Sequence, residues 1–154
     1  GDAKIGHSFD SSLNDSSAKR KGKEIRQAFV SAIDGLAELL AAIKTASEKG
    51  FIRSIDQRKI AVDSPHKALN YLLQSGAGVI AKRWLLINHE NTKELCCSQL
   101  AFIHDELQFE CDPMAADAVS ASLVQSAKAA GEHYLLRLPI SAEAKRGRNW
   151  SEVH

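Results

Sequence analysis

The sequence predicts an α+β fold, in which an antiparallel hairpin packs on long helices and follows a helical N-terminal segment. Three observations support this prediction. Apolar residues recur at helical spacing over residues 25–43. The pairs Ser64-Pro65 and Asp112-Pro113 combine a capping residue with a proline, which is typical of a helix start. Between these two helices, apolar runs flank the triplet His104-Asp105-Glu106 and indicate a hairpin.

The N-terminal third is predicted to begin as a loop, because residues 1–18 are rich in Ser, Asp, Asn and Gly. A short basic run follows at residues 19–23. The helical pattern over residues 25–43 is interrupted at Asp34-Gly35, where we expect Asp34 to cap a second helix. Gly50 is expected to end that helix.

The rest of the chain is predicted to alternate between hairpins and helices. Residues 51–55 and 58–62 flank a turn and indicate a small hairpin. The helix that starts at Ser64-Pro65 is expected to run to about residue 88, and the helix after Asp112-Pro113 to about residue 131. Residues 138–144 are predicted to form a last strand.

The composition is that of an ordinary globular domain. The chain has 154 residues, with 44% hydrophobic and 25% charged, which is enough for one domain with a core. A formal net charge of +1 means that any nucleic-acid contact must come from local patches. No apolar run reaches the ~20 residues of a membrane span, so we expect no membrane partner.

The cysteine count favours a reducing compartment. The three cysteines include the adjacent pair Cys96-Cys97, which argues against a disulfide framework. We expect Cys96, Cys97 and Cys111 to be buried apolar side chains, since they lack structural-zinc spacing. No signal peptide precedes the first predicted element. The chain begins at Gly1 without Met, so we expect a fragment, a processed product or an engineered form that keeps the remnant of a tag.

The His104-Asp105-Glu106 triplet is the strongest candidate for chemistry. Buried carboxylates are costly unless a cation or a hydrogen-bond donor neutralises them. An acidic hairpin turn therefore either faces solvent as an ordinary turn or holds a metal ion. The triplet contains neither Asn-Gly nor Asp-Gly, which two-residue hairpin turns favour. This absence favours a functional site over a plain turn.

A polar row on the helix after Ser64 is the second candidate. His66, Asn70 and Gln74 recur at i, i+4 positions, so they lie along one helix face. All three are neutral hydrogen-bond donors, and the DNA minor groove offers acceptors at nearly the same place for every base pair. Such a row can test base-pair shape without reading sequence. The alternative, a solvated helix face, is the better interpretation of the row without the acidic turn. The opposite face is apolar and is expected in the core: Leu69, Leu72, Leu73, Ile80, Trp84 and Ile87.

The two candidates together resemble the C-terminal part of a family A DNA polymerase, in particular the replicative polymerases of podovirus-type bacteriophages. The segment Ser64-Pro65-His66-Lys67-Ala68-Leu69-Asn70-Tyr71-Leu72-Leu73-Gln74-Ser75 is similar to the helix that touches primer–template. Ile103-His104-Asp105-Glu106-Leu107-Gln108 is similar to motif C. The ends of the chain, residues 1–6 and 147–154, also resemble this family. The resemblance implies a distal fingers segment at 1–50 and a partial palm with motif C at 51–154.

The resemblance implies a role for each candidate residue. Asp105 is the expected catalytic carboxylate that binds Mg²⁺, with Glu106 as its catalytic and metal-binding neighbour. His104 is expected to contact the primer end. Asn70 and Gln74 are expected to reach the minor groove near the primer terminus. His66 is expected to contact DNA one turn earlier. The implied partners are primer–template DNA and an incoming deoxynucleoside triphosphate.

The implied function is template-directed nucleotidyl transfer in DNA replication by a two-metal mechanism. In this family the motif A aspartate and the nucleotide-binding fingers helix belong upstream, and no stretch here resembles them. We therefore expect little activity from this chain alone, and Mg²⁺ binding only together with the motif A carboxylate and substrate. The unpaired hairpin edge predicts self-association or a complementary polymerase fragment. The expected location is the cytoplasm of a bacterial or phage-infected cell.

Two other functions remain open on the sequence. The first is a binding module that grips primer–template DNA without catalysis through the Asn70 and Gln74 row. The second is an interaction domain whose acidic turn is merely exposed. Salt-sensitive DNA binding would favour the first of these, because phosphate contacts release counterions.

Overall fold

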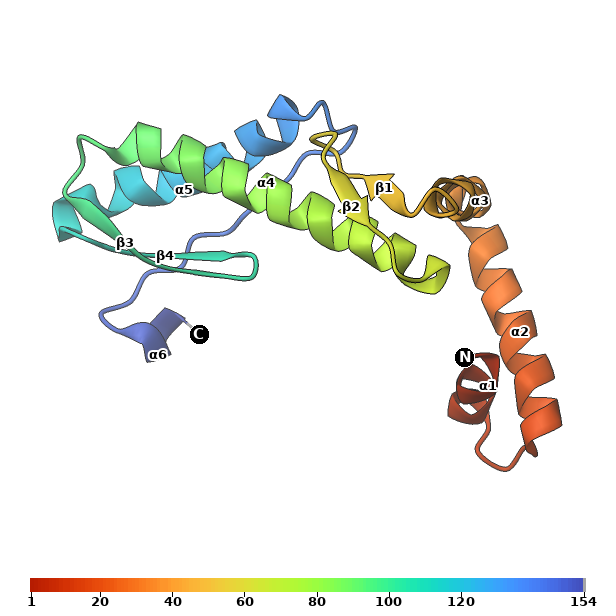
Figure 1. Ribbon diagram of the computed structural model, residues 1–154. Coiled ribbons are helices and arrows are strands. Elements are labelled where there is room, and N and C mark those ends of the chain that lie inside the picture. Colours follow the sequence, from red (N-terminus) through yellow and green to blue (C-terminus); the bar gives the residue numbers. More distant parts are fainter. Residues whose placement is uncertain (154) are drawn as a thin grey trace. The chain divides into compact units, whose positions relative to one another are not determined.

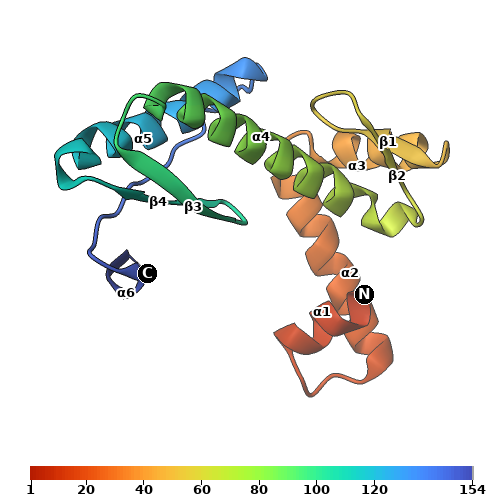
Figure 2. The same ribbon diagram turned by 60° about the vertical axis from the view of Figure 1, so that its left-hand side comes forward.

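The computed structural model describes residues 1–153. The chain forms two compact units: the first contains residues 1–52 and 61–69, and the second contains residues 53–60 and the chain from residue 70 on. Figures 1 and 2 show their helices and hairpins from two directions. The predicted mixture of long helices and small hairpins is confirmed, and β3 and β4 pair antiparallel as expected.

The first unit begins with two closely packed helices, α1 (Asp2–Phe9) and α2 (Asp15–Ala32). The prediction of a loop over residues 1–18 was therefore wrong. Asn14 starts α2, because its side chain accepts a hydrogen bond from Ser17 N at 2.9 Å. A Cβ atom on Gly6 would overlap the carbonyl of Ala18 in α2, so glycine is what allows α1 to lie against α2. This tertiary contact holds a short helix that local propensity does not predict.

Helix α3 (Leu36–Ser47) begins after a break in the position that the sequence predicts. Its N-cap is Gly35, in the left-handed region at φ 78°, and no side chain caps it. The prediction that Asp34 caps the helix was wrong, because Asp34 stands one residue too early to reach the first free amides. Gly50, at φ 76°, lies just beyond α3, as predicted. It is followed by the two-stranded sheet of β1 (Phe51–Arg53) and β2 (Lys59–Ala61).

The Ser64-Pro65 signal produces a 3₁₀ turn, η1 (Pro65–Lys67), which leads into α4 (Ala68–Thr92). Helix α4 continues beyond the predicted end at residue 88. The Asp112-Pro113 signal likewise produces a 3₁₀ turn, η2 (Pro113–Ala115), ahead of α5 (Ala116–His133). Here the Asp112 carboxylate accepts a hydrogen bond from Met114 N at 2.8 Å. Both proline signals therefore mark helix starts correctly, one 3₁₀ turn before the α-helix.

In the second unit, α4 and α5 are joined by hydrogen bonds between their side chains. Asn88 and Ser126 are fully buried at this contact. Ser122 Oγ donates to Asn88 Oδ1 at 2.8 Å, and the indole N–H of Trp84 donates to the carbonyl of Leu123 at 2.8 Å. The apolar core around these bonds is made of small and medium side chains: Val79, Ala81, Leu107, Val119, Ala127 and Ala130.

Two expectations for this unit were wrong. Leu73 was expected in the core but is 60% exposed. The face of α4 that is buried is therefore narrower than the face that carries its apolar residues. The predicted strand over residues 138–144 does not form in the described part of the chain, because it finds no partner strand. That segment packs on α5 instead. A Cβ atom on Gly131 would lie 2.8 Å from Ile140 Cγ1, so glycine admits the segment there.

The central hairpin joins β3 (Cys97–Ile103) to β4 (Glu106–Cys111). Its register runs from the pair Cys97 and Cys111 to the pair Ile103 and Glu106. Leu100 is an extra residue in β3, because the register shifts between Gln99 and Ala101. Figures 1 and 2 show the hairpin running back from the end of α4, beside α4 and α5. A last short helix, α6 (Trp150–Val153), follows the extended segment. No helix among residues 1–153 has the length and apolar character that crossing a membrane requires.

Candidate functional site

The acidic triplet lies at the turn of the central hairpin, as predicted. Ile103 and Glu106 are paired, so His104 and Asp105 alone make the turn. His104 has a φ of 54°, and a positive φ at the first turn position is the backbone that type II′ hairpin turns require. Both turn residues are exposed, whereas Glu106, the first residue of β4, is half-buried. The strands therefore present the Asp105 carboxylate at a solvent-facing tip.

The carboxylates of Asp105 and Glu106 suit Mg²⁺ in kind but not in number. Mg²⁺ prefers hard oxygen ligands and keeps waters and substrate phosphates in its remaining positions. No group of three or more His, Cys, Asp or Glu side chains within the described residues is arranged to hold a metal ion. A metal ion at this turn would therefore need further ligands besides these two carboxylates.

The polar row is confirmed on α4 for Asn70 and Gln74. They lie one helical turn apart, and both side chains are exposed. His66 is also exposed but precedes α4 in η1, so the α-helical row begins at Asn70. His66 belongs to the first unit and the acidic turn to the second. Within the second unit, α4 carries the amide row and the β3–β4 hairpin carries the turn.

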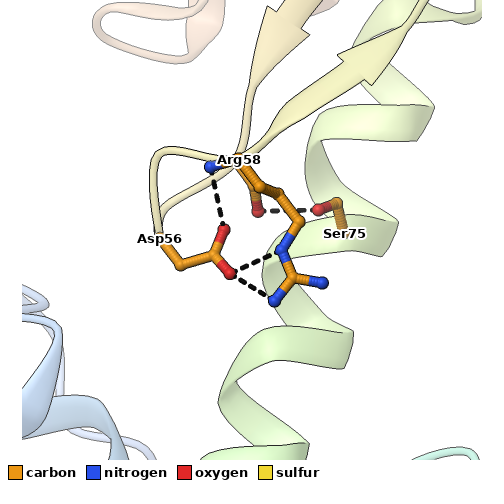
Figure 3. Close-up of polar contacts among 4 residues, drawn as sticks. Asp56, Arg58 and Ser75 are labelled. Atoms are coloured by element: carbon orange, nitrogen blue, oxygen red, sulfur yellow. Dashed lines mark hydrogen bonds and ion pairs between the residues drawn. The ribbon is translucent and has the colours of Figure 1, made fainter.

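A contact that the sequence did not predict supports α4 next to Gln74. The turn between β1 and β2 packs on α4, where Ser75 Oγ donates to Ser54 Oγ at 2.6 Å (Figure 3). Ser54 is only 2% exposed, so this hydrogen bond satisfies a buried hydroxyl. A Cβ atom on Gly76 would lie 3.8 Å from Ile55 Cγ2, which is ordinary contact distance. The turn therefore fits closely against the helix just after the polar row.

The same turn contains an ion pair. Arg58 Nε donates to the Asp56 carboxylate at 2.6 Å, and the Arg58 backbone N–H donates to it at 3.3 Å (Figure 3). The hydrogen bond from the Arg58 side chain lowers the pKa of Asp56 below its ordinary value, against the opposing effect of desolvation. The close spacing of Asp56 and Arg58 in the sequence could have indicated this ion pair. The sequence does not indicate that the turn packs on α4, because Ser75 is distant from the turn in sequence.

Several basic side chains are engaged by other side chains within their own units. In the first unit, Arg26 makes two hydrogen bonds to Asp2, at 2.8 and 3.1 Å. Lys21 lies over the ring of Phe9, 5.1 Å from its centroid. In the second unit, Arg146 pairs with Asp117 at 2.5 Å. These contacts favour structural roles for Arg26 and Arg146, while Lys19, Arg20 and Lys23 are exposed on α2.

Comparison with known proteins identifies the family. The family model for DNA polymerase family A matches residues 17–152. The DNA-directed DNA polymerases of Enterobacteria phage T3 and Escherichia phage T7 are 30% and 29% identical to the chain over its whole length. DNA polymerase I of Aquifex aeolicus is 25% identical over 97% of the chain. The chain spans about a quarter of the length of these relatives.

A solved structure shows the same fold. The POL domain of Pol1 from M. smegmatis, in complex with DNA primer-template and dNTP, superposes with a TM-score of 0.72. The superposition covers 80% of this chain and 24% of that one, at 20% sequence identity. The fold likeness and the family match agree with the resemblance inferred from the acidic turn and the polar row. Because the family model covers most of the sequence, from residue 17 to residue 152, the chain belongs to DNA polymerase family A.

Proposed function

We propose that this chain is the part of a DNA-directed DNA polymerase that supplies motif C and the minor-groove contacts of the palm. One observation carries the proposal: an exposed Asp105 stands at the tip of a paired hairpin, in a chain of DNA polymerase family A. In this proposal residues 1–50 are distal fingers and residues 51–154 are partial palm. The reaction is template-directed nucleotidyl transfer in DNA replication.

The residues of the turn act at the primer end. The Asp105 carboxylate is a catalytic metal ligand, and Glu106 is its neighbour on β4. Mg²⁺, when bound, stabilises the attacking and leaving oxygens of phosphoryl transfer in a two-metal site. His104 lies at the tip with its ring exposed, where it can donate a hydrogen bond to the primer terminus. Both turn residues are exposed, and the positive φ of His104 forms the tight turn that carries them.

The residues of α4 hold the duplex. The amide groups of Asn70 and Gln74 donate to minor-groove acceptors, which base pairs of every sequence present in similar places. His66 contributes a DNA contact ahead of the helix. The contact between Ser75 and Ser54 supports this role, since it secures α4 beside Gln74.

The full reaction needs groups outside these 154 residues. The turn supplies an incomplete carboxylate set, so a motif A aspartate and the nucleotide-binding fingers helix must come from a further part of the polymerase. The partners are primer–template DNA and a deoxynucleoside triphosphate. The complex of the M. smegmatis POL domain with DNA primer-template and dNTP supports this choice of partners. The proposed location is the cytoplasm of a bacterial or phage-infected cell.

A complementary polymerase segment, or a second copy of this chain, is proposed to cover the central hairpin. Leu100, Phe102 and Ile103 of β3 are 61%, 37% and 43% exposed, which leaves apolar area in water next to the acidic turn. Light scattering that shows only monomer would count against self-association and leave the complementary segment.

DNA binding without catalysis is the second candidate for this chain alone. Two observations favour it. No group of metal-binding side chains is complete within the described residues, whereas both amide side chains of the polar row are exposed on α4. In this case the chain binds primer–template but incorporates no nucleotide by itself.

The test of the catalytic proposal is primer extension by a polymerase reconstituted with this chain. Asp105→Asn keeps the size of the side chain and removes its charge, so we expect incorporation to fall by at least about a hundredfold, as when a catalytic electrostatic group is lost. Asp34→Asn is the matched control, because Asp34 is an exposed carboxylate in the first unit, and it should leave incorporation unchanged. Equal incorporation by the parent and Asp105→Asn would remove Asp105 from the mechanism.

A further inference from the structure

Two cysteines face each other at the open end of the central hairpin. Cys97 in β3 is the register partner of Cys111 in β4. Asp112 N donates to the carbonyl of Cys96 at 3.0 Å, so Cys96 and Asp112 form a hydrogen-bonded pair. Because such pairs alternate along an antiparallel ladder, Cys97 and Cys111 occupy a non-hydrogen-bonded position, where opposite side chains share a face and stand closest.

This position meets the backbone requirement of a disulfide. Opposite Cα atoms in non-hydrogen-bonded pairs stand about 4.5 Å apart, and disulfides span Cα distances of about 4.4–6.8 Å. Cys96 has no such partner among the described residues, since it is aligned with Asp112. The register therefore favours a disulfide between Cys97 and Cys111 over one that includes Cys96.

The surroundings make the thiols accessible. The expectation that all three cysteines are buried was wrong: Cys96 is exposed, and Cys97 and Cys111 are half-buried. They line a shallow hollow of about 230 Å³ together with Ser98 and Glu110. The Cys97 thiol donates a weak hydrogen bond to the carbonyl of Thr92 at 3.8 Å. Because Cys97 and Cys111 are both partly exposed and line this hollow, it is the side from which a small oxidant would approach them.

We propose that Cys97 and Cys111 are a redox modification site, which a low-molecular-weight disulfide oxidises to a reversible intrachain disulfide. One cysteine thiolate attacks a sulfur of the oxidant, whose S–S bond breaks and releases one thiolate. The second cysteine thiolate attacks the mixed disulfide, so a bond forms between the two cysteine sulfurs and the second small thiolate leaves. The chain loses two electrons and two protons, and the oxidant becomes two thiols.

The modification has a structural consequence at the other end of the hairpin. The disulfide closes a loop from residue 97 to residue 111 that contains His104 and Asp105. Closing this loop reduces the number of conformations in which β3 and β4 are separated. The disulfide therefore stabilises the pairing of the two strands, while the turn stays exposed. The inference stands apart from the proposed function, because thiol pairing does not depend on what Asp105 does.

The test is a direct determination of the disulfide. The full chain is equilibrated with mixtures of oxidised and reduced glutathione, and the free thiols are blocked by alkylation. Trypsin would leave all three cysteines in one peptide, from residue 94 to residue 128. A glutamate-specific protease cuts after Glu106 and Glu110 and so separates the strands. Mass spectrometry then detects the two peptides joined, with two hydrogens lost.

The variants define the pair. We expect the joined peptides from the parent and from Cys96→Ser, and not from Cys97→Ser or Cys111→Ser. The folded chain should become half-oxidised at a ratio of oxidised to reduced glutathione at least about tenfold lower than in concentrated urea, because the fold brings the two thiols together. This measurement uses the parent alone, so a variant that misfolds does not affect it.

Several results would overturn the proposal. One is the appearance of joined peptides from Cys97→Ser, which must be linked through Cys96, in the same amount as from Cys96→Ser. Another is an equal oxidation midpoint with and without urea, which would mean that the fold does not select the pair. Disulfides found only between separate chains would also overturn it. None of these results bears on primer extension, so failure here is distinct from failure of the proposed function.

Discussion

Replacing the two amides of the α4 row tests how the chain holds DNA. The change is Asn70→Ala with Gln74→Ala. Both side chains are exposed on the body of a helix, and Ala is the best helix former, so the fold should be kept. The double variant alters no charge. It therefore separates hydrogen bonding in the minor groove from attraction to phosphate.

The expected loss follows from the number of hydrogen bonds. A neutral hydrogen bond contributes about 0.5–1.5 kcal/mol net, so two amide contacts contribute roughly 1–3 kcal/mol. Since about 1.4 kcal/mol is a factor of ten, the dissociation constant should rise by between about fivefold and about 140-fold. The dependence of the logarithm of affinity on the logarithm of salt concentration should keep its slope, because that slope counts neutralised phosphates.

Fluorescence anisotropy of a labelled primer–template measures both quantities at several salt concentrations. Gln125→Ala is the matched control, because Gln125 is an exposed neutral amide on α5 of the same unit. It should bind like the parent. Primer–templates of different sequence should lose affinity equally, since the minor-groove acceptors are nearly the same for all base pairs.

Three results would refute the reasoning. Affinity within about twofold of the parent at every salt concentration would mean that the row does not touch DNA. A loss confined to some template sequences would contradict contacts that read base-pair shape. A flatter salt dependence would show that the substitutions had disturbed phosphate contacts instead.

Two further predictions concern the framework of the two units. Gly22→Ala should lower the free energy of unfolding by about 1–3 kcal/mol, because the added methyl group overlaps the carbonyl of Asp2. Gly78→Ala should raise the free energy of unfolding by up to about 1 kcal/mol, because the space around Gly78 is open. Urea denaturation measures both changes, and equal effects of the two substitutions would contradict the close crossing of α1 and α2. The Arg58 side chain lowers the pKa of Asp56 in the folded state, so this pair contributes stability above the ordinary carboxyl value of 3.8 and loses it as pH falls through the folded pKa. Arg58→Met should remove that part of the acid sensitivity, as followed by urea denaturation over a pH series, and an unchanged pH profile would contradict the assignment.

Local signals predicted much of the fold. The proline pairs at Ser64-Pro65 and Asp112-Pro113 marked both helix starts, because proline fits only the first helical turn. The apolar runs around His104-Asp105-Glu106 located β3 and β4, since runs of apolar, strand-forming residues are a local property of the sequence. The exposed Asn70 and Gln74 followed directly from the helical period.

Long-range packing decided the features that local patterns missed. Helix α1 depends on glycines that let it approach α2, and the segment over residues 138–144 is not a strand because it packs on α5 rather than on a strand edge. The Ser54–Ser75 hydrogen bond joins residues far apart in sequence. No periodicity records such contacts, since they depend on which surfaces the folded chain brings together.

The sequence by itself determined the family of this protein, the place of its acidic turn and the order of its main helices, because short motifs and the helical and strand periods record these directly. Only the tertiary structure decided that Cys97 and Cys111 share one face, that Leu73 is exposed, and that a buried serine secures α4 beside the polar row. The register of a strand pair and the burial of a side chain are set by partners elsewhere in the chain, and a local pattern does not identify those partners.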